Sequence, residues 1–205
     1  MKKSVLVVFG GQSSEHIVSC MSAINVIKNI DTERYDVTLI GITEEGKWLL
    51  VDSVEQIEEV SWRKNTTTAI LSPDATEKSV IVLKDGKAEM IRIDVVFPVL
   101  HGLWGEDGTI QGVLNYLGIP YTGPGVTASA MAIDKDLTKR VWRSAGIPVP
   151  EGVMIDPKAD DAVLEEAIAC LGATGLVVKP AHDGSSIGVT KLAEPTVAAL
   201  RKALE

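Results

Sequence analysis

Short continuous apolar runs alternate along the chain with longer amphipathic stretches. Residues 4–9 are an unbroken apolar run that ends at two glycines, which predicts a strand buried on both faces of a parallel sheet. Residues 15–29 repeat apolar positions at helical spacing, with Ser13 or Ser14 as candidate N-caps. Residues 36–42 form a second strand-like run, so the order strand, helix, strand predicts a right-handed parallel crossover.

The next fifty residues are less regular. Short apolar runs are separated by the turn signals EGK and DGK, and we expect edge strands and no chemistry over residues 48–51, 79–84 and 88–91. Residues 94–100 return to the pattern of a buried strand, and Pro98 predicts that its pairing ends nearby. A short helix is expected over residues 109–117.

Residues 118–125 are rich in Gly and Pro and mark a predicted domain boundary. The chain then divides into residues 1–124, a Rossmann-like parallel-sheet domain, and residues 125–205, a second partial domain. In this second part the pattern predicts helices over 133–145, 160–171 and 194–205, and two paired strands over 175–179 and 187–191. The fold class is therefore α/β.

Composition excludes several classes of partner. The 205 residues carry 20 Lys+Arg and 28 Asp+Glu, and a formal net charge of -8 argues against nucleic-acid binding. No window approaches the roughly 18–20 apolar residues that span a bilayer, and the first apolar run is too short for a signal peptide. Cys20 and Cys170 lie in apolar helical contexts and are expected as core residues without a disulfide, so we expect a cytoplasmic protein.

The first candidate site is residues 10–15 (GGQSSE), between the first strand and the first helix, where ligands bind in open α/β sheets. Glycines at the first, third and sixth positions are absent, which disfavours a nicotinamide oxidoreductase. Glu15 is open to two interpretations, a capping residue or a partner for a substrate ammonium group. We expect His16 to be a solvated helix residue.

The second candidate site is residues 101–112 (HGLWGEDGTIQG). Its four glycines indicate that the backbone there makes a close approach to other atoms. His101 is open to two interpretations, orienting a carboxylate or serving as a structural histidine. Glu106 and Asp107 suggest metal ligation, but helix capping is the better interpretation because hard-metal sites need several matched oxygens.

The third candidate site follows Lys179, which ends an apolar strand and precedes a loop of Gly and Ser. A positive point charge beside close backbone N–H donors is what a phosphate cradle requires, although the residues alone favour a simple hairpin turn. No Walker pattern is present. Lys135 stands at a helix start, where the helix dipole disfavours it, and this indicates an external anion.

Taken together, these segments resemble the D-alanine–D-alanine ligase family of the ATP-grasp superfamily over nearly the whole chain. Residues 10–19 match the family pattern GGxSxExxVS, and residues 101–112 match HGxxGEDGxxQG without a departure. The tripeptide at 121–123, the stretch 133–135 and the block 178–188 follow in the family's order, with Ile133 where the family often has Met.

The resemblance implies ATP-dependent joining of two D-alanines for peptidoglycan precursor synthesis. The first carboxylate is phosphorylated to an acyl phosphate, and the second amine then displaces phosphate. Carried onto this chain, Glu15 would hold the ammonium group of the first D-alanine, and His101 would lie near its reacting carboxyl group. Ser185 would help to fix Glu15 through a hydrogen-bond network.

The resemblance also implies how ATP binds. Lys135 and Lys179 would contact its phosphates, under a closing loop that supplies Gly184, Ser185, Ser186 and Gly188. Family members continue beyond residue 205, and the continuation carries the Mg²⁺ ligands, so none is assigned to this chain. We therefore expect an N-terminal piece with the small ATP-grasp lobe begun, unable to catalyse ligation alone, and a homodimer formed through the first domain.

Other functions stay open at this point. The second substrate could be D-serine or D-lactate, because the deciding loop is not in this sequence. Another ATP-grasp carboxylate–amine ligase would share the lysine and glycine-loop plan, although the HGxxGEDG block weighs against it. A non-catalytic binding or dimerisation module is the remaining alternative.

Overall fold

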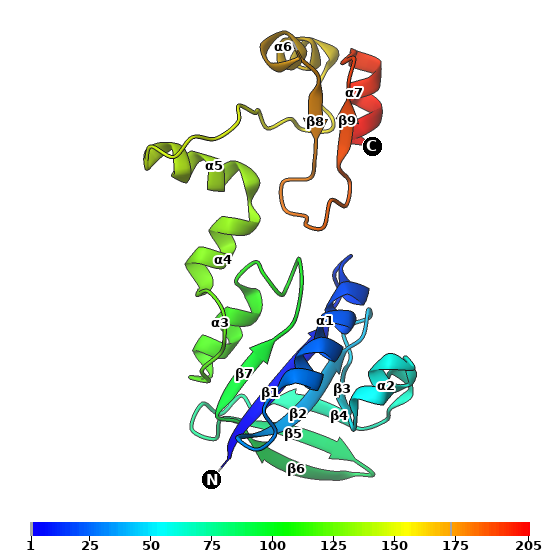
Figure 1. Cartoon of the computed structure of the whole chain (residues 1–205), viewed down its shortest axis with the longest axis vertical. Coiled ribbons are helices and arrows are strands. Elements are labelled where there is room, and N and C mark those ends of the chain that lie inside the picture. Colours follow the sequence, from blue (N-terminus) through cyan, green and yellow to red (C-terminus); the bar gives the residue numbers. More distant parts are fainter. Residues whose placement is uncertain (1, 173) are drawn as a thin grey trace. The chain divides into compact units, whose positions relative to one another are not determined.

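A computed structural model describes residues 2–172 and 174–205 and shows two compact units, Met1–Ala130 and Met131–Glu205 (Figure 1). The first unit is built on a seven-stranded sheet in the order β6-β5-β4-β3-β2-β1-β7. Its strands are β1 Lys3–Gly10, β2 Tyr35–Ile42, β3 Trp48–Val51, β4 Thr68–Leu71, β5 Ser79–Lys84, β6 Lys87–Arg92 and β7 Val95–Pro98.

Three neighbouring strands of this sheet are parallel. β1 pairs with β2 on one side and with β7 on the other, both in parallel. The predicted parallel crossover is thus confirmed, and the helix between β1 and β2 is α1, His16–Asn29. β7 ends at Pro98, as the missing backbone N–H of proline predicts.

The remaining four strands extend the sheet in antiparallel fashion. The expectation of edge strands is wrong for β3 and β5, which lie inside the sheet, and right for β6, which forms one edge. The DGK turn signal is confirmed, because β5 and β6 are joined by Asp85 and Gly86, both with positive φ. The sequence pattern missed β4.

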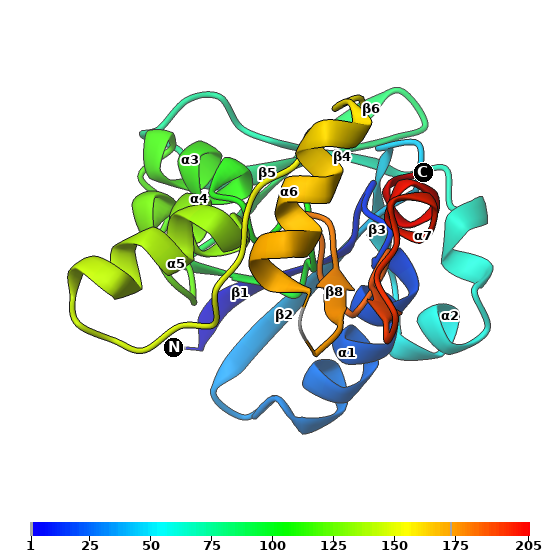
Figure 2. The same cartoon turned by 90° about the horizontal axis from the view of Figure 1, so that it is seen from above.

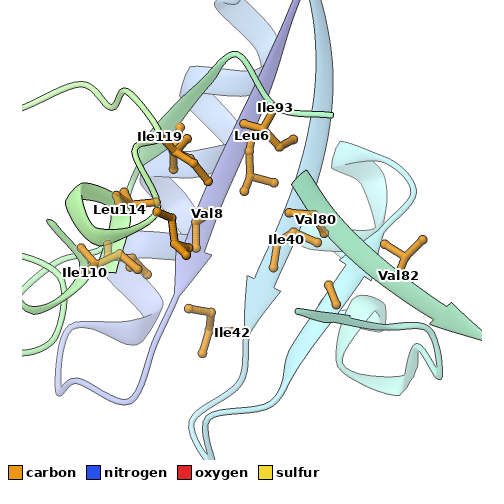
Figure 3. Packing of buried hydrophobic residues seen from close by; sticks show 14 residues of the cluster. Leu6, Val8, Ile40, Ile42, Val80, Val82, Ile93, Ile110, Leu114 and Ile119 are labelled. Atoms are coloured by element: carbon orange, nitrogen blue, oxygen red, sulfur yellow. The ribbon is translucent and has the colours of Figure 1, made fainter. Parts of the chain in front are cut away.

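The sheet has a hydrophobic layer on each face, because β1 alternates its side chains between them. Leu6 and Val8 pack in the cluster that includes α3, Thr109–Tyr116, as Figure 3 shows. Val7 and Phe9 pack on the other face with α1, α2 (Val54–Glu58) and the 3-10 helix Ser61–Lys64. Each fully buried side chain of this size contributes about 1.5–3 kcal/mol to folding. β1 is therefore the centre of the first unit.

The second unit contains an antiparallel hairpin of β8 (Leu176–Val178) and β9 (Thr190–Leu192) (Figure 1). It also contains the helices α6 (Asp161–Leu171) and α7 (Val197–Leu204) (Figure 2). α7 contacts both strands and α6. The paired strands and both helices were expected, with slightly different bounds. The helix predicted over 133–145 is wrong in its start: α4 (Val126–Ile133) ends there, and α5 (Lys135–Ser144) begins after Asp134.

Asp134 explains this break. Its side chain accepts hydrogen bonds from the backbone N–H groups of Asp136 and Leu137, both at 2.9 Å, so it caps a new helix. The cysteine prediction is half wrong, since Cys20 is half-buried but Cys170 is exposed; both are free. In the part of the chain that the structure describes, no helix has the length and apolar character to cross a membrane.

Candidate functional site

Two loops follow the carboxyl ends of the neighbouring parallel strands β1 and β7, the position at which ligands bind in open α/β sheets. We call residues 10–15 the glycine turn and residues 99–108 the histidine loop. The Ser13 hydroxyl donates a hydrogen bond to the His101 carbonyl oxygen at 2.7 Å and accepts one from the Glu15 N–H at 3.2 Å. The two loops are therefore joined directly.

Glu15 is the N-cap residue of α1 and is buried, with 4% of its surface exposed. Neither serine expected as the N-cap occupies that position. The Glu15 carboxylate lies against Gly102, where an added Cβ would be 2.7 Å from the Glu15 Oε2 atom and where φ is +68°. Only glycine suits this backbone conformation and this close approach. The packing thus brings the Glu15 carboxylate onto the histidine loop.

His101 lies at the start of the histidine loop and is half-buried. Its Nε2 atom is 3.1 Å from the Ser22 hydroxyl oxygen on α1, and its Nδ1 atom is 3.9 Å from Glu106 Oε1. The structure therefore brings His101 and Glu15, predicted separately from sequence, into one pair of joined loops.

The burial of His16 contradicts the prediction that it is a solvated helix residue. Its side chain is buried, its Nδ1–H donates to the Gly11 carbonyl oxygen at 2.7 Å, and its ring stacks on Trp62 with a centroid distance of 6.2 Å. The residues around position 16 do not indicate this burial, because Trp62 lies 46 positions further along the chain. His16 therefore holds the glycine turn from the core side.

The acidic residues of the histidine loop stabilise its backbone. The Asp107 carboxylate accepts hydrogen bonds from the N–H groups of Trp104 and Thr109, each at 2.9 Å. Burial acts to raise the pKa of Asp107, but these hydrogen bonds hold the pKa below its ordinary value. Glu106 accepts a hydrogen bond from the Gly102 N–H at 2.8 Å. The contact of Asp107 with Thr109, the first residue of α3, agrees with the helix-capping interpretation, whereas Glu106 binds the backbone of the loop instead.

Sequence reasoning missed one residue that shapes this loop. Gln111, on α3, is buried, and its side-chain amide donates to the Gly105 carbonyl oxygen at 2.8 Å. Its position as the Gln of the HGxxGEDGxxQG pattern was the available signal. A buried amide that satisfies a loop carbonyl fixes the loop on the helix.

In the second unit, the loop between β8 and β9 is both a hairpin connection and the wall of a cavity of about 260 Å³. The cavity is lined by Lys135, Lys179, Pro180, Asp183, Gly184, Ser185, Ser186, Ile187 and Val189. Ser185 and Ser186 both have positive φ, which turns the loop sharply. Gly188 lies outside the lining, close to Pro180, where an added Cβ would be 2.7 Å from the proline Cγ.

Lys135 ties this loop to the start of α5. Its backbone N–H donates to the Ala181 carbonyl oxygen at 3.1 Å, and its Nζ group donates to the carbonyl oxygens of Ala181 and Asp183. Beside it, His182 Nε2 is 3.2 Å from Asp134 Oδ2. The N–H of Leu137 holds the pKa of Asp134 below its ordinary value against the opposing effect of burial, with help from Asp136 and His182.

The cavity therefore combines two lysines with a tight loop of small residues, the groups that bind phosphate oxygens. Among residues 2–172 and 174–205, no group of three or more His, Cys, Asp or Glu side chains could hold a metal ion. The predicted link between Ser185 and Glu15 joins residues of different units and stays a prediction.

Comparisons with known proteins identify the family of this chain. The family model described as "D-ala D-ala ligase N-terminus" matches residues 4–124. The D-alanine–D-alanine ligase of Thermoanaerobacter pseudethanolicus is 44% identical over 194 residues, covering 93% of this chain and 54% of that protein. That of Rhodococcus erythropolis is 46% identical over 197 residues, covering 92% and 53%. The chain thus spans about half the length of these curated relatives.

Solved structures show the same likeness. The VanG D-Ala:D-Ser ligase from Enterococcus faecalis matches with a TM-score of 0.84 and 36% identity, over 100% of this chain and 59% of that one. The D-alanine-D-alanine ligase from Coxiella burnetii also gives a TM-score of 0.84, at 32% identity, over 99% and 59%. The chain belongs to the D-alanine–D-alanine ligase family and corresponds to its N-terminal portion.

Proposed function

We propose that this chain supplies the first-substrate site and part of the phosphate site of an ATP-dependent ligase that joins two D-alanines through an acyl phosphate. The observation that carries the proposal is the buried Glu15 carboxylate held against Gly102. Both residues belong to sequence blocks that match the family patterns. A carboxylate held at the carboxyl ends of two parallel strands is suited to binding a small cationic group.

In this proposal the glycine turn and the histidine loop hold the first D-alanine. Glu15 accepts hydrogen bonds from the substrate ammonium group, and such charge-assisted hydrogen bonds are roughly twice as strong as neutral ones. His101 lies near the reacting carboxyl group, where an imidazole held by Ser22 keeps a fixed orientation. The pair of loops therefore orients both ends of one small amino acid.

The cavity of the second unit holds phosphates. ATP, when bound, supplies the phosphoryl group that activates the first carboxylate. Lys135 and Lys179 neutralise phosphate charge, and the loop with Ser185 and Ser186 supplies hydroxyl and backbone N–H donors. At an effective dielectric near 20, one lysine about 4 Å from a phosphate oxygen gains about 4 kcal/mol before desolvation.

Further parts of the proposal concern the longer protein. We propose that magnesium ligands and the second-substrate loop lie in the part of that longer protein that corresponds to the half of the relatives not spanned by this chain. The proposal also includes a cytoplasmic location and a homodimer. Formation of the homodimer through the first unit is supported by three exposed apolar side chains on α1, those of Ile17, Val18 and Met21.

The first-substrate site can be tested on the 205-residue chain. We expect D-alanine to shift the backbone NMR signals of Glu15 and Gly102 more than L-alanine does, and Glu15→Gln to weaken that response at least tenfold. Glu89→Gln, on the exposed strand β6, is the control and should bind as the parent does. Equal binding by Glu15→Gln and the parent would remove Glu15 from the site.

The phosphate site has its own test. Lys179→Ala should weaken ATP binding at least tenfold, while Lys84→Ala, at the exposed end of β5, should leave it unchanged. ADP release with Mg²⁺-ATP and either D-alanine or D-serine then measures turnover, which we do not expect from this chain alone. Absence of binding for both D-alanine and ATP would favour the non-catalytic module.

A further inference from the structure

Ser19 connects the ends of the two strands that carry the site. Its side chain has 0% exposure, and its hydroxyl accepts a hydrogen bond from the Gly10 N–H at 2.7 Å and donates one to the Val99 carbonyl oxygen at 2.6 Å. Gly10 begins the glycine turn, and Val99 begins the histidine loop. One buried hydroxyl on α1 therefore bridges the starting points of both loops.

Ser13 repeats this arrangement further along the same loops. Its hydroxyl accepts from the Glu15 N–H and donates to the His101 carbonyl oxygen. In both cases a serine takes a hydrogen bond from the glycine turn and gives one to the histidine loop. The loops are thus joined at two levels, at their starting points by Ser19 and beside Glu15 and His101 by Ser13.

Few other side chains could make both hydrogen bonds of Ser19 in this buried position. Buried backbone N–H and carbonyl groups need partners, and leaving one unsatisfied costs much more than an average hydrogen bond contributes. Alanine at position 19 would deprive both Gly10 and Val99 of this partner. The two loops would then separate until water or other groups supplied an acceptor for the Gly10 N–H and a donor for the Val99 carbonyl oxygen, and the separation would move Glu15 relative to His101.

We infer that Ser19 is a positioning residue: its hydroxyl sets the spacing between the glycine turn and the histidine loop, and thereby between Glu15 and His101. Its effect on substrate binding rests on the proposed function, but its effect on the loops does not. Small displacements of binding groups lower activity strongly, because well-oriented contacts depend on spacing at the ångström level.

The test compares two buried serines of the first unit. Ser19→Ala removes a hydroxyl with two partners, whereas Ser79→Ala removes an equally buried hydroxyl that has no hydrogen-bond partner among the described residues. We expect Ser19→Ala to lower the hydrogen-exchange protection of the Gly10 amide about tenfold or more and to shift the NMR signals of the His101 ring. Ser79→Ala should leave both unchanged. Unaltered Gly10 protection and His101 signals in Ser19→Ala would overturn the inference.

Ser19→Cys keeps the test decisive if Ser19→Ala does not fold, because it fills the site with a thiol that hydrogen-bonds more weakly than the hydroxyl. We expect it to lower the protection of the Gly10 amide and to shift the His101 signals, and unchanged protection and signals would then overturn the inference. D-alanine titration separates the two claims. A folded Ser19→Ala protein should bind D-alanine at least tenfold more weakly than the Ser79→Ala protein. If the parent chain does not bind D-alanine, the proposed function fails while the loop measurements still decide the role of Ser19.

Discussion

The side chain of Trp62 restricts the residue at position 41 of β2, which it covers, to glycine. Its ring is 1% exposed and lies over Gly41 of β2, where an added Cβ would be 2.5 Å from the ring. The same ring packs edge-on against Phe9 at 5.2 Å and stacks on His16. The tryptophan therefore supports the glycine turn through His16, although it is distant from the turn in sequence.

We expect Trp62→Ala to lower the free energy of unfolding by about 3–5 kcal/mol, because it leaves a large cavity among well-packed rings. Urea unfolding followed by circular dichroism measures the change. Trp104→Ala is the matched control, since Trp104 is 56% exposed and should change stability by less than about 1 kcal/mol. Similar losses in the two variants would contradict the packing argument.

The two cysteines differ in their chemistry. Burial is the largest effect on Cys20 and raises the pKa of its thiol from 9.0 to about 11, with Arg63 acting against it and Glu44 with it. The folded protein therefore holds this proton more tightly than the unfolded chain does. The resulting stabilisation is complete below pH 9 and is lost as pH rises from 9 to 11.

In a Cys170→Ser protein, we expect the iodoacetamide alkylation rate of Cys20 to keep rising up to about pH 11. The Cys20→Ser protein, which keeps only the exposed Cys170, is the control and should be alkylated faster at pH 8. A Cys20 rate that levels off below pH 9 would show that burial does not suppress ionisation.

At the scale of elements, two glycine positions allow the effect of backbone conformation on stability to be distinguished from the effect of steric clashes. An added Cβ at Gly86 or at Gly112 would meet no atom within 4 Å. Gly86 has φ +73° in the β5–β6 turn, whereas Gly112 lies inside α3. Any difference between alanine variants at these positions therefore comes from the backbone.

We expect Gly86→Ala to destabilise the protein by about 1 kcal/mol, since alanine is strained at positive φ. Gly112→Ala should stabilise it by about 0.5–1 kcal/mol, because alanine favours the helix. Thermal unfolding of the two variants beside the parent gives the signs directly. Changes of the same sign would contradict this assignment to backbone conformation.

Elements with a local signal could be predicted from the sequence, and elements that depend on distant contacts could not. The apolar run of β1 and the DGK turn both indicate their structures within a few residues. The break at Asp134 has a local cause as well, but the apolar pattern continues through it and hides the cap. β4 is short and pairs only in the context of its neighbours.

The same distinction applies to the candidate site. The placement of Glu15 and His101 on neighbouring loops could be predicted, because glycine-rich blocks follow the two buried strands that lead to them. The contacts of Ser19 could not, since its partner Val99 is 80 positions away. The burial of His16 could not be predicted for the same reason, because it depends on Trp62. Spacing along a chain thus indicates which loops lie at the ends of neighbouring strands but not which side chains hold those loops together.

At the scale of the whole molecule, the two units differ in the size of their cores. The first unit has two clusters of buried side chains around its sheet. Among the described residues of the second unit, the buried hydrophobic side chains are Leu164, Ala167 and Leu200. A small buried apolar area gives little stabilisation, so the second unit has less resistance to local opening.

We therefore expect amides of β8 and β9 to exchange with deuterium at least tenfold faster than amides of β1 and β2, as measured by mass spectrometry after digestion. The exposed turn between β5 and β6, within the first unit, is the internal reference for unprotected amides. Equal protection of β1 and β8 would mean that the cores are equivalent in stability.

The strand β6 forms one edge of the large sheet, and its backbone leaves a row of hydrogen-bonding groups without a neighbouring strand. Its exposed surface carries Lys87, Glu89 and Arg92 around the exposed Met90. A strand of a second chain that paired with β6 would place its side chains next to these charged groups. The charged edge therefore protects the protein against aggregation, and replacing its charges with apolar β-branched residues would remove that protection.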